Sequence, residues 1–193
     1  MSDHQEKFEI ILAGSGGQGL VVSGIMLAEA AMLEGKNVVQ TVSYGIASRG
    51  GFSMAEVIMD REEIIFQQVQ QADVILALTE EAMEKFQDLS GQGTLIFYDT
   101  TLLKPRRGEG LYGQPFTEMA SQMGHVGMAN IIALGYMAVE KKMVRPESLA
   151  AVLQKRFSGK VLQMNLKALE AGVALAARET DDSERNDNGR LKP

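Results

Sequence analysis

The chain has 193 residues, which is room for one α/β domain around a single core. Its formal net charge of −6 argues against nucleic acid as the main ligand. Cysteine is absent and the only histidines are His4 and His125, which excludes disulfides, thiolate catalysis and Fe–S ligation by this chain and argues against a histidine-built metal site. The first residues lack the apolar stretch of a secretory signal and no apolar run is long enough to span a bilayer, so the sequence predicts a cytoplasmic protein outside the membrane.

The first half of the chain predicts strands that alternate with helices. Residues Phe8–Ala13 form a short apolar run that ends at a glycine, as a buried parallel strand does. Apolar residues then recur at helical spacing from Gln18 to Glu34, and Asn37–Val42 has the composition of a strand, which together predict a parallel βαβ unit. Further strands are predicted over Gly50–Asp60, Ala72–Thr79 and Gly93–Thr100, with a short helix over Glu80–Leu89. The alternation predicts a single doubly wound, mostly parallel sheet with flanking helices, which is a Rossmann-like α/β fold.

The pattern changes after the last of these strands. Residues 102–116 are rich in Pro, Gly and Arg and predict an irregular excursion over the surface. Helical periodicity returns over 128–142, 145–157 and 161–178, so the C-terminal part is predicted to be helical. Residues 180–193 are polar and lack an apolar stripe, which predicts a disordered tail. The predicted organisation is an N-terminal extension over 1–7, one α/β domain over 8–179 and a tail over 180–193.

A glycine-rich loop joins the first strand to the first helix. Gly14, Gly16 and Gly19 match the pattern G-x-G-x-x-G in the strand–loop–helix context in which that pattern binds phosphate. The alternative is a close-packed turn with no ligand. A dinucleotide site normally has an acidic residue about twenty residues further on, and none stands at Val39–Thr41. No Lys-Ser/Thr pair of the Walker type follows the glycines either, so NAD and ATP are both disfavoured.

A second candidate segment, "SYGIASRGGF", follows the second predicted strand at the edge of the sheet where open α/β folds bind ligands. Arg49 next to Gly50 and Gly51 offers a bidentate donor for a phosphate or carboxylate on a flexible backbone. A contact between subunits explains the same residues equally well, because arginine is enriched at interfaces. An RNA-binding RGG box is the weaker explanation, since the motif occurs once and in an apolar context.

Four motifs in this order resemble the gamma subunit, or gamma domain, of 2-oxoacid:ferredoxin oxidoreductases: "GSGGQG", "SYGIASRGG", "MANIIALG" and "NLKALEAG". The resemblance extends from about Phe8 to Ala177. It implies a complex that oxidatively decarboxylates a 2-oxoacid to an acyl-CoA and passes electrons to ferredoxin. It further implies that thiamine diphosphate, Mg²⁺ and Fe–S clusters belong to the alpha, beta and possibly delta (ferredoxin-like) subunits, because this chain has neither cysteine nor the Gly-Asp-Gly motif of thiamine enzymes.

The resemblance also bears on the substrate. "SYG" followed by three residues and "RGG" is most similar to the subunits that serve 2-oxoglutarate, whereas Ile46, Ala47 and Ser48 replace the Pro-Glu-x commonly found there. "GIASRGG" is also similar to indolepyruvate-type members, and a pyruvate-type member remains an alternative. Two alternatives from other classes are a freestanding nucleotide-binding Rossmann oxidoreductase and a pure scaffold subunit with a vestigial glycine loop.

For this chain the resemblance implies a subunit without catalytic residues or metal ligands, inactive alone, that assists assembly and contributes to CoA binding. Asn130 matches an asparagine that recurs at the head of this helix in the family, where it caps the helix or contacts a ligand. Thr79, Asp99 and Thr100 end predicted strands at the ligand edge and are secondary candidates. The residues assigned to ligand binding are Gly14, Ser15, Gly16, Gly17, Gln18, Gly19, Tyr44, Arg49, Gly50, Gly51 and Asn130.

Overall fold

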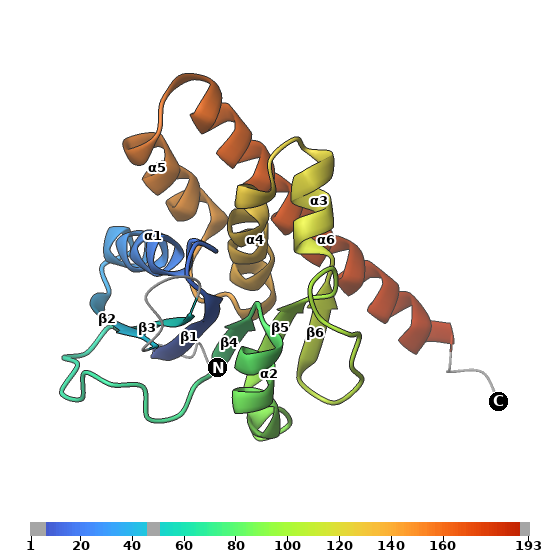
Figure 1. The fold of residues 1–193 in the computed structure, drawn as a ribbon, viewed down its shortest axis with the longest axis horizontal. Helices are drawn as coiled ribbons and strands as arrows, with labels where there is room; N and C mark the ends of the chain where they lie inside the picture. The colour runs from blue at the N-terminus through green and yellow to red at the C-terminus, as the bar shows by residue number, and fades with distance from the viewer. Residues whose placement is uncertain (1–6, 46–50, 190–193) are drawn as a thin grey trace.

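The computed structural model describes residues 7–45 and 51–189, and within them one sheet of six strands is covered by helices (Figure 1). The strands are β1 (Phe8–Ser15), β2 (Asn37–Tyr44), β3 (Phe52–Asp60), β4 (Val74–Ala77), β5 (Leu95–Asp99) and β6 (Leu111–Gln114). The helices are α1 (Leu20–Leu33), α2 (Glu80–Phe86), α3 (Phe116–Gln122), α4 (Ala129–Lys141), α5 (Pro146–Arg156) and α6 (Gly159–Gly189), with short 3₁₀ turns η1 (Gln87–Leu89) and η2 (Val126–Met128).

The strand order across the sheet is β2-β3-β1-β4-β5-β6. The pairs β1–β4, β4–β5 and β5–β6 are parallel, which confirms the predicted mostly parallel sheet. β3 is antiparallel to both β1 and β2, so β1 and β2 run in the same direction as predicted but are not neighbours. The reason is the short connection between β2 and β3, which can join only antiparallel neighbours and so inserts β3 between the two strands of the βαβ unit.

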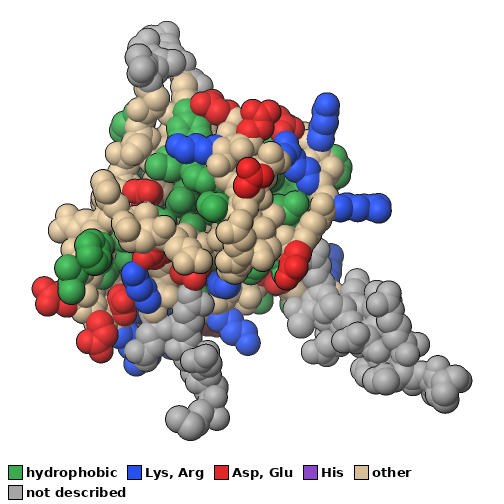
Figure 2. Space-filling model, turned by 90° about the horizontal axis from the view of Figure 1, so that it is seen from below, with side chains coloured by type: hydrophobic (Ala, Val, Ile, Leu, Met, Phe, Trp, Pro, Cys, Tyr) green, Lys and Arg blue, Asp and Glu red, His purple; other side chains and the backbone are tan. Residues whose placement is uncertain are grey.

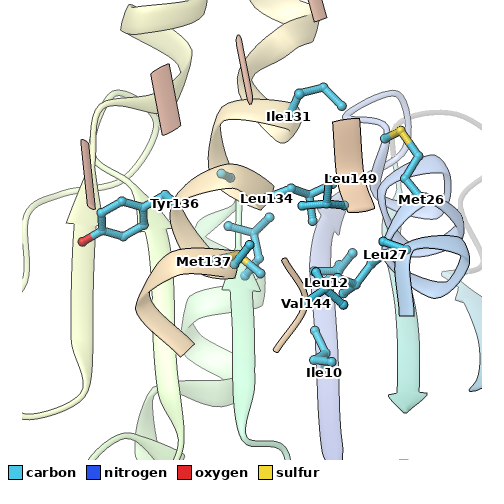
Figure 3. Packing of buried hydrophobic residues seen from close by; sticks show 14 of the residues in the cluster. Ile10, Leu12, Met26, Leu27, Ile131, Leu134, Tyr136, Met137, Val144 and Leu149 are labelled. Carbon is cyan, nitrogen blue, oxygen red and sulfur yellow. The ribbon is translucent and has the colours of Figure 1, made fainter. Parts of the chain in front are cut away.

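The central strand β1 is buried on both faces, and its successive side chains point to opposite sides of the sheet. Ile10 and Leu12 belong to a large apolar cluster with α1, α4, α5 and α6, and Figure 3 shows them beside Leu27 and Val144. The alternate residues Ile11 and Ala13 of β1 belong to a second cluster under α2. Helices on both faces confirm the predicted doubly wound class.

Two glycines set the packing of α4 against α6. A Cβ at Gly172 would lie 2.0 Å from the carbonyl oxygen of Ile132, and a Cβ at Gly135 would lie 2.5 Å from that of Leu169. The two helix backbones therefore touch at these glycines, which are the last residues of "NLKALEAG" and "MANIIALG". Two of the motifs that carry the family resemblance thus mark this helix crossing.

Two features differ from the sequence-based expectations. The segment predicted as an irregular excursion contains β6 and the start of α3, because pairing with β5 orders the four residues Leu111–Gln114 despite their poor strand composition. The backbone of α6 is helical as far as Gly189, whereas a disordered tail was expected from residue 180. Extending a helix that is already formed adds one hydrogen bond per residue and needs no buried surface. Residues 1–6 and 190–193 lie outside the described residues.

The surface carries charges of both signs. In Figure 2, seen from below, acidic and basic side chains are interspersed around an apolar area. Among residues 7–45 and 51–189, no helix combines the length and the apolar composition that crossing a membrane requires.

Candidate functional site

The glycine loop turns the chain from the end of β1 into α1. Gly17 and Gly19 have φ angles of +97° and +74°, in the region that favours glycine. Gly19 is the N-cap residue of α1, and among residues 7–45 and 51–189 no side chain caps this helix. The first turn of α1 therefore presents backbone N–H groups and the positive end of the helix dipole without a side-chain acceptor, which is the arrangement that binds anions.

Gln18 holds the loop in this shape. Its Oε1 accepts a hydrogen bond from the N–H of Ser15 at 2.7 Å, and its Nε2 donates to the carbonyl of Leu78, just after β4, at 3.1 Å. A Cβ at Gly14 would lie 2.3 Å from the same Oε1, so Gly14 leaves the space that Gln18 occupies. Both ends of the Gln18 amide are thus engaged within the protein, which favours a positioning role for this side chain over direct ligand contact.

The second candidate segment meets the glycine loop at the start of β3. The N–H of Gly16 donates to the carbonyl of Gly51 at 3.0 Å, which joins the two motifs directly. Tyr44 ends β2 and is 71% exposed, so its ring is available at the surface. Arg49 and Gly50 lie outside the described residues, and their placement stays a prediction.

Asn130 links the start of α4 to the start of α1. Its Nδ2 donates to Ser23 Oγ at 3.0 Å and to the carbonyl of Gly19 at 3.4 Å. Asn130 lies inside α4 and makes no cap, so the capping role considered for it is not what the structure shows. The physical reason is that the chain enters α4 through the η2 turn, where His125 Nδ1 accepts from the N–H of Gly127 at 3.0 Å.

A pocket of about 410 Å³ opens beside this junction, between the first turns of α1 and α4 and the start of α6. Gly19, Asn130 and His125 all contribute to its lining, and the rest is mostly apolar. The pocket was not anticipated, because no local pattern identifies a cavity built by three helices. Ser23 was not anticipated either. It is fully buried inside α1, and only the hydrogen bond that it accepts from Asn130 shows that it helps to link α1 to α4.

Two secondary candidates have structural roles. Thr79 caps α2, with its Oγ1 accepting from the N–H of Ala82 at 3.2 Å. The carboxylate of Asp99 is buried and accepts from the N–H of Thr101 at 2.9 Å and from the N–H and hydroxyl of Thr117 at 2.9 and 2.6 Å. Asp99 therefore anchors the first turn of α3 to the end of β5.

The sequence matches one protein family over most of its length. The family described as pyruvate ferredoxin/flavodoxin oxidoreductase matches residues 9–175. A 2-oxoglutarate synthase subunit KorC from Archaeoglobus fulgidus is 40% identical over 172 residues, which cover 89% of each chain. A second subunit of that name, from Methanocaldococcus jannaschii, is 33% identical and covers 87% of this chain and 93% of the relative.

Solved structures agree with these sequence matches. The gamma subunit of a keto/oxoacid ferredoxin oxidoreductase from Geobacter sulfurreducens PCA superimposes with a TM-score of 0.75 at 31% identity, covering 89% of this chain and 99% of that one. The 2-oxoglutarate:ferredoxin oxidoreductase of Magnetococcus marinus, solved with 2-oxoglutarate, coenzyme A and succinyl-CoA bound, superimposes with a TM-score of 0.82 at 28% identity. That match covers 90% of this chain but only 32% of the solved chain, so the protein spans about a third of that relative.

Proposed function

The chain belongs to the pyruvate ferredoxin/flavodoxin oxidoreductase family as a gamma subunit, and from this premise we propose that it helps assemble a complex that oxidatively decarboxylates 2-oxoglutarate and that it contributes to the binding of CoA. The similarity to the two KorC subunits supports 2-oxoglutarate over indolepyruvate or pyruvate as the substrate. The product of the proposed reaction is an acyl-CoA, and the electrons released by the oxidation pass to ferredoxin.

One observation carries the proposed CoA contact: the hydrogen bond from the N–H of Gly16 to the carbonyl of Gly51. It joins the glycine loop to the segment that contains Arg49, at the edge where β1 ends and β3 begins. CoA carries a diphosphate and a 3′-phosphate, which suit both an uncapped helix N-terminus and an arginine. We infer that the first turn of α1 and Arg49 bind one phosphate group together.

The redox cofactors of the complex are assigned to other chains. The protein contains no cysteine, so its residues do not fit an Fe–S cluster. We propose that the chain is a non-catalytic subunit, inactive alone, and that the alpha and beta subunits, with a ferredoxin-like delta subunit where the complex has one, hold thiamine diphosphate, Mg²⁺ and the clusters. The contribution of this chain is then to bind and orient CoA for the reaction on its partners.

The test is CoA dependence in the reconstituted complex. Arg49→Ala removes a charge-assisted contact worth about 1.5–3 kcal/mol, so the KM for CoA should rise roughly 10- to 150-fold. Gly16→Val should raise it further, because a side chain obstructs the approach of an anion to the backbone. Arg107→Ala is the matched control, since Arg107 is exposed in the connection between β5 and β6.

Size-exclusion profiles of the same variants separate ligand binding from assembly. The proposal expects intact complexes with weakened CoA kinetics. Normal CoA kinetics in intact complexes of both Arg49→Ala and Gly16→Val would contradict it. Loss of the partner subunits before any change in CoA dependence would favour the scaffold alternative, in which the segment is only an interface.

A further inference from the structure

The pocket beside Gly19 has the composition of a small-molecule site. Its volume of about 410 Å³ lies in the range of ligand pockets, which are mostly apolar with a few placed polar groups. Met26, Met128 and Met164 contribute thioethers, and Phe157 contributes an aromatic ring. Thioethers are polarizable and pack well against flat aromatic ligands.

Asn130 brings an unused acceptor to this pocket. The carbonyl of Gly19 can only accept a hydrogen bond, so the amide must present Nδ2 to it, and Ser23 Oγ takes the second amide hydrogen. Asn130 Oδ1 is left buried without a hydrogen-bond partner among the described residues, although the residue is only 7% exposed. A buried acceptor of this kind is costly and rare, and an N–H donor from a ligand would satisfy it.

His125 provides the complementary donor. Its Nδ1 accepts from the N–H of Gly127, so in the neutral ring the proton resides on Nε2. His125 also lines the pocket. The pocket therefore combines the acceptor of Asn130 and the donor of His125 with mostly apolar walls, and Asn165, whose Nδ2 donates to the carbonyl of Val161, adds a further polar side chain to the lining. Adenine matches this combination, because its exocyclic amine donates, its ring nitrogens accept and its faces are flat and apolar.

We propose that this pocket binds the adenine ring of the nucleotide whose phosphates the glycine loop binds. The inference rests on the proposed function, because CoA is the nucleotide in question. Gly19 connects the two sites, because it is the last residue of the glycine loop and also lines the pocket. Oδ1 is buried, so the Asn130 amide or a flexible methionine shifts when the amine of adenine reaches it. An apolar side chain from a partner subunit would fill the walls but leave Oδ1 unpaired.

The decisive variant is Val161→Trp, which fills the pocket from its rim. Val161 is 52% exposed, so the substitution spares the core. Asn130→Leu removes the acceptor, but it also breaks the contacts with Gly19 and Ser23, so it serves as the second variant. Leu102→Trp is the control, because Leu102 is 47% exposed and does not line the pocket.

The assay is performed on the reconstituted complex with two competitors of CoA. Adenosine 3′,5′-bisphosphate carries the adenine, and pantetheine 4′-phosphate lacks it. We expect Val161→Trp to raise the KM for CoA and the inhibition constant of adenosine 3′,5′-bisphosphate at least about tenfold, the effect of losing one good hydrogen bond and its packing. The inhibition constant of pantetheine 4′-phosphate should stay as in the control.

Unchanged inhibition by adenosine 3′,5′-bisphosphate in an intact Val161→Trp complex would overturn the adenine site. Failure of that variant to assemble would overturn it as well, because the pocket would then be a partner contact. In both cases the Gly16→Val variant reports separately on the proposed function. If its KM for CoA is raised, CoA binding at the loop stands and only the adenine site falls. If the KM for CoA is normal in intact complexes of both Gly16→Val and Arg49→Ala, the proposed function and the adenine site both fall.

Discussion

Replacing Gly172 by alanine is expected to destabilise the fold, although alanine is the better helix former. The added Cβ would lie 2.0 Å from the carbonyl oxygen of Ile132 and 2.9 Å from the nitrogen of Tyr136, whereas ordinary contact begins at 3.4 Å. The nearest atoms are all backbone, so no rotamer change relieves the overlap, and α6 must move away from α4 by about 1.4 Å.

The magnitude follows from two opposing effects. Overpacking costs about 1–3 kcal/mol and, with backbone atoms on both sides, the upper end applies. The helix propensity of alanine offsets about 1 kcal/mol of this. The net loss of about 2 kcal/mol corresponds to a fall in Tm of about 4–8 °C for a domain of this size.

The assay is thermal unfolding of the purified chain, followed by circular dichroism. Ala174→Gly is the matched control, because Ala174 is exposed on the same helix and reports the propensity effect alone, about 1 kcal/mol. A Tm for Gly172→Ala equal to or above that of the unsubstituted protein would refute the reasoning. It would mean that α4 and α6 do not touch through their backbones at this point.

Two further predictions concern buried carboxylates. Burial opposes ionisation of Glu9, but the hydrogen bond from Lys7 and the N–H groups of Gln70 and Gln71 outweigh it, so the pKa of Glu9 in the folded protein lies below its ordinary value of 4.5. The stabilisation that the ionised Glu9 contributes to the fold is therefore complete above pH 4.5 and is lost as the pH falls through the folded pKa. The unfolding free energies of the protein and of Glu9→Gln, measured by urea titration, should therefore converge on acidification. A constant difference between them from neutral to acidic pH would count against this. Asp99→Ala leaves the N–H and hydroxyl of Thr117 on α3 unpaired, so it should lower the free energy of unfolding by about 3 kcal/mol in the same titrations while the KM for CoA stays unchanged. A raised KM in a stable variant would show a ligand role instead.

The buried strands, the glycine loop and the family motifs of this protein could be predicted from short stretches of sequence. Continuous apolar runs identified β1, β4 and β5, because a strand buried on both faces needs mostly apolar residues along its length. The glycine loop was equally visible, since left-handed φ angles at Gly17 and Gly19 restrict those positions to glycine. The family resemblance was also carried by local motifs, two of which end at the glycines of the α4–α6 crossing.

Contacts between distant segments decided the remainder. β6 has four residues and is ordered by β5, and β3 lies between β1 and β2 because of its short connection. Asn130 was selected from its local motif, but its partners Gly19 and Ser23 are more than a hundred residues away, and only the packing of α4 beside α1 unites them. The pocket and the unpaired Oδ1 exist only in that packing. Periodicity and turn chemistry depend on neighbours in sequence, whereas a binding pocket depends on which helices meet, and that is set by the summed packing of the whole core.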